Sequence, residues 1–184
     1  MTVDTMSMFL ALLAVIAQAA VVAVAVLFVT RHVSGRVDRW RALLIDEVGP
    51  HALALAFAVA TTATAGSLYF SEVAHFTPCR LCWYQRICMY PLVPILGLAA
   101  VRRDHGVRPY AAALAVIGAV VASYQVLLER FPTLESSVCD PNTPCTLIWV
   151  NRFGYLTIPA MALSGFALVL TLLATDCPPR NSAP

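Results

Sequence analysis

This 184-residue chain has few charged residues. Only 12% of the residues are charged, lysine is absent, and all twelve basic residues are arginines. A soluble domain has about 25% charged residues, so the composition excludes an ordinary water-soluble fold. The net charge is only +2, and no basic patch is interleaved with aromatic side chains, which argues against nucleic acid as a partner.

Apolar residues stand where a soluble protein would have charges. They make up 60% of the chain, and the mean hydropathy is +0.77. The long apolar runs cover residues 7–30, 52–70, 83–101, 110–128 and 158–174. As a helix, the first run spans roughly 35 Å, which is enough to cross a bilayer. The sequence therefore predicts an all-α membrane protein with five transmembrane helices.

The distribution of arginine predicts how these spans are oriented. The segments expected to face the cytoplasm contain Arg31, Arg36, Arg39, Arg41, Arg102, Arg103, Arg108 and Arg180, and those near the other face contain Arg80, Arg86, Arg130 and Arg152. By the positive-inside rule, the N-terminus lies outside and the C-terminus inside. The first run is expected to remain as a helix, because residues 1–6 lack the basic segment of a signal peptide.

The cysteines fall into two close pairs and two single residues. The pairs are Cys79 with Cys82 and Cys139 with Cys145, and the single residues are Cys88 and Cys177. The predicted orientation puts both pairs on the extracytoplasmic face, where paired cysteines indicate redox work rather than metal binding. A four-thiolate zinc site is the weaker alternative, because C-x5-C is an unusual second half for such a site. We therefore predict no metal.

The first pair lies where the third span begins. Unpaired backbone amides and the helix dipole at a helix N-terminus favour an anion there, so Cys82 is a candidate thiolate. Arg86 lies about 40° around the helix from Cys82 and roughly 6 Å deeper, on the same face. Its guanidinium could stabilise the thiolate and the charge that develops on a carbonyl oxygen of a membrane-borne oxidant. Cys88 points elsewhere and is predicted to be a small packing residue.

The second pair lies in a long loop between the last two spans. Residues 139–145 read C-D-P-N-T-P-C, and proline and asparagine favour tight reversals, so a Cys139–Cys145 disulfide is feasible. Spacing alone leaves open whether this pair is a structural staple or a second redox pair. The apolar residues 147–150 that follow are expected to lie along the membrane surface.

Two stretches resemble one known family. Residues 79–86 read C-R-L-C-W-Y-Q-R and are followed by M-Y-P at 89–91, and residues 153–159 read F-G-Y-L-T-I-P. These motifs resemble the DsbB/BdbC family of disulfide bond formation proteins over roughly residues 51–175. The resemblance implies a four-helix transmembrane bundle, to which this chain adds one N-terminal transmembrane helix.

The same resemblance implies a function and residue roles. The protein would reoxidise an extracytoplasmic DsbA-like thioredoxin-fold partner and pass the electrons to a membrane quinone, either ubiquinone or menaquinone. Cys79 and Cys82 would lie next to the quinone, with Cys82 in contact with it and Arg86 supporting it. Cys139 and Cys145 would exchange with the partner, with Cys139 forming the mixed disulfide.

The chain is accordingly expected to have three parts in a bacterial cytoplasmic membrane. Residues 1–50 would form the extra helix and a basic cytoplasmic loop, 51–175 the DsbB-like core, and 176–184 a short cytoplasmic tail. Two alternatives remain: a membrane scaffold with purely structural disulfides, and a quinone reductase of the vitamin K epoxide reductase type. The C-W-Y-Q-R run favours the thiol oxidase over the latter.

Overall fold

Five long helices dominate the protein. The computed structural model describes residues 2–30, 42–43, 45–134, 139 and 143–176, so the predictions for loop 31–41, Cys177 and Arg180 lie outside the described residues. The helices are α1 (Val3–Val29), α3 (Ala52–Leu68), α4 (Arg80–Arg102), α5 (Arg108–Arg130) and α6 (Ile158–Thr175). Each belongs to a helical segment long and apolar enough to cross a membrane, which confirms the predicted all-α membrane fold.

Short helical turns complete the connections. They are η2 (Gly49–His51), the π-helical η3 (Tyr69–Val73), η4 (His105–Val107) and η5 (Pro132–Leu134). The turn η4 is followed directly by α5, so α4 and α5 are joined within a few residues. Short connections of this kind place consecutive helices side by side and antiparallel.

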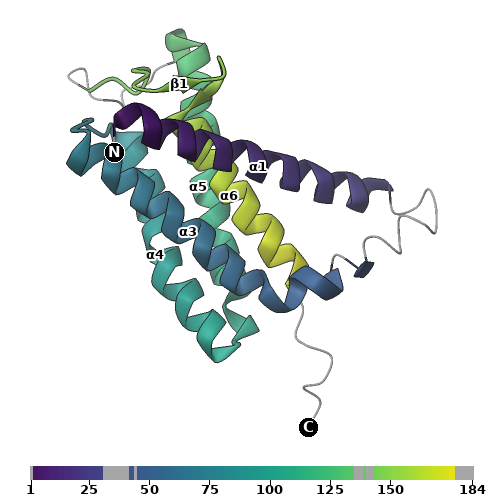
Figure 1. Cartoon of the computed structure of the whole chain (residues 1–184). Coiled ribbons are helices and arrows are strands. Elements are labelled where there is room, and N and C mark those ends of the chain that lie inside the picture. Colours follow the sequence, from purple (N-terminus) through teal and green to yellow (C-terminus); the bar gives the residue numbers. More distant parts are fainter. Residues whose placement is uncertain (1, 31–41, 44, 135–138, 140–142, 177–184) are drawn as a thin grey trace.

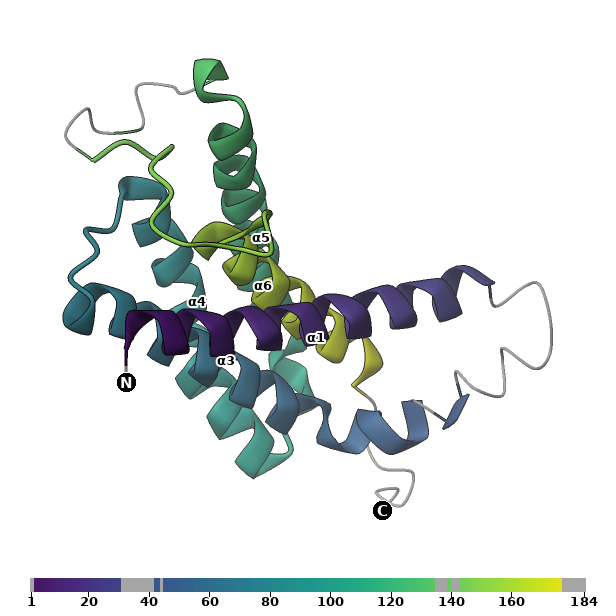
Figure 2. The ribbon, with the colours of Figure 1, turned by 45° about the horizontal axis from the view of Figure 1, so that its top comes forward.

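Four of the long helices form a ring. Helix α3 packs against α4, α4 against α5, α5 against α6, and α6 returns to α3 (Figure 1). Helix α1 stands outside this ring and packs mainly on α6. Both views show that α1 starts beside the bundle and diverges from it toward its C-terminal end (Figure 2).

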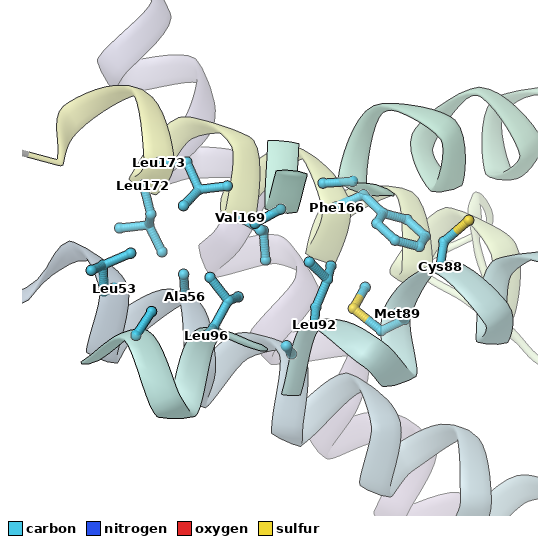
Figure 3. Packing of buried hydrophobic residues seen from close by; sticks show 14 of the residues in the cluster. Leu53, Ala56, Cys88, Met89, Leu92, Leu96, Phe166, Val169, Leu172 and Leu173 are labelled. Atoms are coloured by element: carbon cyan, nitrogen blue, oxygen red, sulfur yellow. The ribbon is translucent and has the colours of Figure 1, made fainter. Parts of the chain in front are cut away.

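The centre of the ring is a single apolar core. Leu92 and Leu96 of α4 meet Phe166 and Val169 of α6 there, and all four side chains are completely buried (Figure 3). Cys88 is buried in the same cluster, in agreement with its predicted role as a small packing residue.

Small residues let the helices approach one another closely. Helix α5 turns one face of Ala111, Ala115, Gly118 and Ala122 inward, and all four are buried. In lipid there is little hydrophobic drive between helices, so close packing across small residues holds such bundles together. Gly118 lies against the ring of Phe166, where a β-carbon would overlap the ring carbons.

A short hairpin connects the long loop to α6. Strand β1 (Asn151–Arg152) pairs antiparallel with β2 (Leu156–Thr157). Gly154 at the turn has a φ of 76°, a left-handed conformation that glycine adopts without steric cost. Thr157 then caps α6, because its hydroxyl accepts a hydrogen bond from the Ala160 amide.

Helix α1 is attached to the bundle by polar contacts as well as by packing. Gln18, the polar residue within its apolar run, donates to the Ser164 hydroxyl at 2.9 Å and accepts from the Tyr155 hydroxyl at 2.9 Å. At the start of α1, Arg152 of the hairpin forms an ion pair with Asp4 and donates to the Ser7 hydroxyl. These contacts fix the first half of α1 against α6 and the hairpin.

The close contact between Gly118 and Phe166 leads to a prediction about the stability of the protein. We expect Gly118→Ala to destabilise the protein, because overpacking a core costs about 1–3 kcal/mol. That cost should exceed the gain of about 1 kcal/mol that alanine brings to a helix. The midpoint of thermal unfolding in detergent should fall.

Gly165→Ala provides the matched control. Its added β-carbon would meet Met89 at 3.7 Å, which is an ordinary contact, so the same substitution on α6 should leave the unfolding midpoint unchanged or higher. Equal midpoints for the two variants would contradict the close fit at Gly118.

Candidate functional site

The turn between α3 and α4 brings the first cysteine pair to one end of the bundle. After the π-helical η3, His75 adopts a left-handed φ of 55°, and the chain reverses direction before Cys79. Histidine is among the side chains that visit this region more often than most. Cys79 is the N-cap of α4, one turn from Cys82.

The two sulfurs of this pair face each other at the helix start. Cys79 Sγ accepts a hydrogen bond from the Cys82 amide at 3.4 Å, and the two Sγ atoms lie 3.1 Å apart as free thiols. Cys82 therefore lies in the first turn of α4, as predicted. The backbone amides of this turn and the positive end of the helix dipole favour negative charge on the sulfurs.

A buried glutamine from another helix points at both sulfurs. Gln125 of α5 donates from Nε2 to Cys79 Sγ at 3.3 Å and to Cys82 Sγ at 3.4 Å. Its carbonyl oxygen accepts from Gln85 Nε2 at 2.7 Å and, over 3.8 Å, from Cys82 Sγ, so Gln85 helps to fix the orientation of the amide. Gln125 is 3% exposed, so these hydrogen bonds are shielded from bulk water.

The pair is electrostatically asymmetric. The hydrogen bond to Cys82 raises the pKa of the Cys79 thiol well above its ordinary value, and burial raises it further. Cys79 therefore keeps its proton and can share it with the Cys82 sulfur. This arrangement suits a pair in which Cys82 is the first sulfur to carry negative charge.

Arg86 is buried one turn below Cys82. Its Nε donates to the Ser67 hydroxyl at 2.9 Å, one terminal nitrogen donates to the Ser67 carbonyl at 3.0 Å, and its guanidinium lies 5.2 Å from the centre of the Trp83 ring. Among the described residues these partners are uncharged, so no carboxylate neutralises the guanidinium. A buried cation without a counter-charge is available to stabilise an anion or a polarised carbonyl.

The second pair is a disulfide beside the first. Cys139 and Cys145 are bonded, with their α-carbons 5.8 Å apart, so the loop closes as the sequence permitted. Both are buried in one small cluster with Cys79, Leu81 and Leu128. The structure thus brings together two cysteine pairs that lie about 60 residues apart in sequence. Cys139 is 8% exposed and Cys145 is 1% exposed, so the disulfide is buried.

Two cavities meet at Cys82. The smaller, of about 200 Å³, lies between the first pair and Thr143 and Pro144 of the disulfide loop. The larger, of about 370 Å³, contains the side chains of Cys82, Arg86 and Glu129 at one end and is otherwise mostly apolar. Ligand pockets for small molecules have volumes of about 300–1,000 Å³, so the larger cavity is of the right size.

An aromatic stack covers the outer side of this end. Trp149 of the loop stacks on Phe76 with ring centres 4.8 Å apart, and Phe76 stacks on Phe70 at 5.8 Å. Trp149 also borders both cavities. The loop segment expected at the membrane surface therefore contacts the site itself.

The described residues contain no group of three or more histidine, cysteine or acidic side chains placed to hold a metal ion.

The family model described as Disulfide bond formation protein DsbB matches residues 50–175. This stretch holds both cysteine pairs and the four helices of the ring. The chain belongs to the DsbB family. The resemblance carried by the C-x-x-C motif is thereby confirmed, and the DsbB-family chain is a multi-pass membrane thiol oxidoreductase of disulfide bond formation.

Curated relatives carry names of the same kind. Disulfide bond formation protein C of Bacillus subtilis is 44% identical over 116 residues, which cover 62% of this chain and 84% of the relative. Probable disulfide formation protein C 2 of Bacillus anthracis is 43% identical over 121 residues, with 66% and 86% covered. A probable disulfide formation protein of Deinococcus radiodurans is 47% identical over 134 residues, with 66% and 86% covered. No solved structure matches this chain.

Several side chains of the site lie outside the residues predicted from the sequence. Ser67, Gln125 and Glu129 come from α3 and α5, and nothing in the local sequence ties them to the cysteines. A usable signal existed for Gln125, because a lone amide within an apolar span is costly in lipid unless it has a partner. Gln85 stood within the quoted motif without an assigned role.

The contact of Gln125 with both sulfurs makes a reactivity prediction. We expect Gln125→Leu to slow alkylation of Cys82 by iodoacetamide about tenfold, because a hydrogen bond to a charged group contributes about 1.5–3 kcal/mol. The reduced protein, with Cys88 and Cys177 replaced by alanine, would be alkylated at fixed pH, and modification of Cys82 followed by mass spectrometry.

Ser123→Leu is the control for this experiment. Ser123 is exposed on the same helix, two residues away, so leucine there should leave the alkylation rate unchanged. An unchanged rate in Gln125→Leu as well would show that the amide does not stabilise the Cys82 sulfur.

Proposed function

We propose that this DsbB-family chain oxidises an extracytoplasmic DsbA-like thioredoxin-fold protein and transfers the electrons to a membrane quinone. The observation that carries the proposal is the position of Cys82. It borders the small cavity next to the disulfide loop and also the large apolar cavity that contains Arg86. A residue at this junction can receive electrons from one side and release them on the other.

The outer pair would exchange with the partner. A thiolate of the reduced partner attacks the Cys139–Cys145 bond, and a second partner thiol then closes the partner's own disulfide, leaving Cys139 and Cys145 as thiols. These thiols in turn reduce a Cys79–Cys82 disulfide and recover their own bond. After that exchange the outer pair would again be bonded and the inner pair would be two thiols.

The inner pair would pass the electrons on. A bound quinone would supply an acceptor for two electrons and two protons. Cys82 holds its sulfur at the cavity, and Cys79 Sγ lies 3.1 Å behind it, positioned to form the Cys79–Cys82 bond as the electrons leave. The two thiols release the two protons, and Arg86 offers N–H donors where a carbonyl oxygen gains negative charge.

The larger cavity fits such a group. Its charged and amide side chains gather around Cys82 and Arg86, Thr62 adds a hydroxyl further along α3, and the rest of the lining is largely aliphatic and aromatic. A quinone has the same division, with a polar ring at one end of an apolar tail. Ubiquinone and menaquinone share these features, and both are compatible with the cavity.

The proposed location is the bacterial cytoplasmic membrane. The positive-inside rule supports an outer N-terminus and a cytoplasmic C-terminus, with both cysteine pairs on the extracytoplasmic face. In this arrangement residues 51–175 carry the chemistry, while residues 1–50 add a helix and a cytoplasmic loop.

A turnover assay tests the proposal. The purified full-length protein, given a reduced DsbA-like protein from the same organism and a quinone, should form the partner's disulfide over many turnovers, and only with quinone present. Absence of turnover with both a benzoquinone and a naphthoquinone would reject quinone-linked oxidation. A Cys139–Cys145 bond that the partner cannot reduce would favour the scaffold alternative.

Replacing the buried guanidinium tests its role. Arg86→Ala should raise the apparent KM for quinone about tenfold or more, because a charge-assisted hydrogen bond is lost. The thermal unfolding midpoint should show that the protein remains folded. Arg80→Ala, at an exposed arginine of the same helix, should leave the KM for quinone unchanged. A normal quinone KM in Arg86→Ala would remove Arg86 from the quinone site.

A further inference from the structure

Helix α1 lies outside the family match yet borders the large cavity. The match begins at residue 50, whereas α1 ends at Val29. Leu10, Leu13, Ala14 and Ala17 of this helix all line the cavity that contains Cys82 and Arg86. The added helix therefore forms part of the cavity wall, although the four-helix ring is complete without it.

The contacts of α1 close one side of the cavity. Helix α1 is seated on α6 through the Gln18–Ser164 hydrogen bond, and Leu10 reaches across to Gly66 of α3. A β-carbon at Gly66 would lie 2.8 Å from a Leu10 methyl group, so the glycine permits this close approach. Along this line α1 bridges α6 and α3, the two ring helices that flank the cavity.

The cavity extends along α1 away from the cysteines. Its lining continues from Arg86 and Gly66 to Ala58 of α3 and Leu168 of α6. Gly66 and Ala58 are eight residues apart on one helix, which corresponds to about 12 Å of helix axis. Apart from Thr62, the lining of this portion is apolar, and it lies too far from Cys82 to hold the ring of a quinone bound there.

We infer that α1 is the wall against which the apolar tail of the quinone lies, and that it selects among quinones by their tails. This inference rests on the proposed function, since the quinone ring would occupy the end at Cys82 and Arg86. Leu13 is the most direct contact to test, because it borders the cavity from the middle of the docked half of α1. On binding, the quinone tail would leave the lipid for an equally apolar protein surface. The affinity for the tail would therefore depend on how closely it packs against α1 rather than on hydrophobicity.

Direct binding distinguishes tail from ring. The probes are two matched pairs: decylubiquinone with its tail-free benzoquinone ring, and menaquinone of four isoprene units with menadione. Equilibrium Kd values would be measured on the purified full-length protein with the inner pair in a defined redox state. Leu13→Phe should weaken binding of the tailed quinone about tenfold, because the larger side chain would take up cavity space that the tail needs, and should leave binding of the tail-free ring within about twofold. Leu13→Ala should change the Kd of the tailed quinone by less than about threefold.

Leu12 supplies the matched control. It is 51% exposed and does not border the cavity, so Leu12→Phe should bind both members of each pair as the parent protein does. Equal affinity of Leu13→Phe and the parent protein for the tailed quinone would overturn the role of α1 and leave the quinone proposal standing. Equal losses for tailed and tail-free probes would also overturn it, by placing Leu13 at the ring. Failure of the parent protein to bind any probe would reject the quinone proposal, and this inference with it.

Discussion

A guanidinium enclosed by membrane helices must find its hydrogen-bond partners within the protein, because lipid supplies none. Arg86 finds them on one residue, Ser67 of α3, through both the hydroxyl and the backbone carbonyl. Tyr90 donates to the same hydroxyl, so α3 and α4 are joined at the depth of the redox site. The position of the C-x-x-C pair relative to the cavity depends on this junction.

The same constraint orders the cysteines. Gln125 must also satisfy its amide inside the bundle, and it does so with the two sulfurs on one side and Gln85 on the other. Helices α3, α4 and α5 are therefore linked by polar groups around a pair of sulfurs. In such a setting, small movements of one helix change the field that a thiolate experiences.

Much of the fold was predictable, because each membrane span corresponds to one continuous apolar run in the sequence. The start of α4, the exposure of Cys82 to the helix dipole and the shared face of Cys82 and Arg86 follow from spacing alone. Ser67, Gln125 and Glu129 could not be assigned to the site, since their roles arise from which helices pack together. Burial of the Cys139–Cys145 pair was missed for the same reason: the loop folds back onto α4 and α5, and its sequence shows only that it can turn.

The polar contacts that attach α1 to the hairpin and to α6 have a consequence for how the protein is inserted into the membrane. Asp4 and Arg152 are separated by 148 residues, and Gln18 and Ser164 by 146. Helix α1 leaves the ribosome before the other four long helices of the described chain, but it can dock only after the hairpin and α6 have been synthesised. Until then one flank of the cavity stands open to the bilayer. Insertion of the nascent chain therefore passes through a stage in which lipid can reach the part of the cavity that α1 later covers.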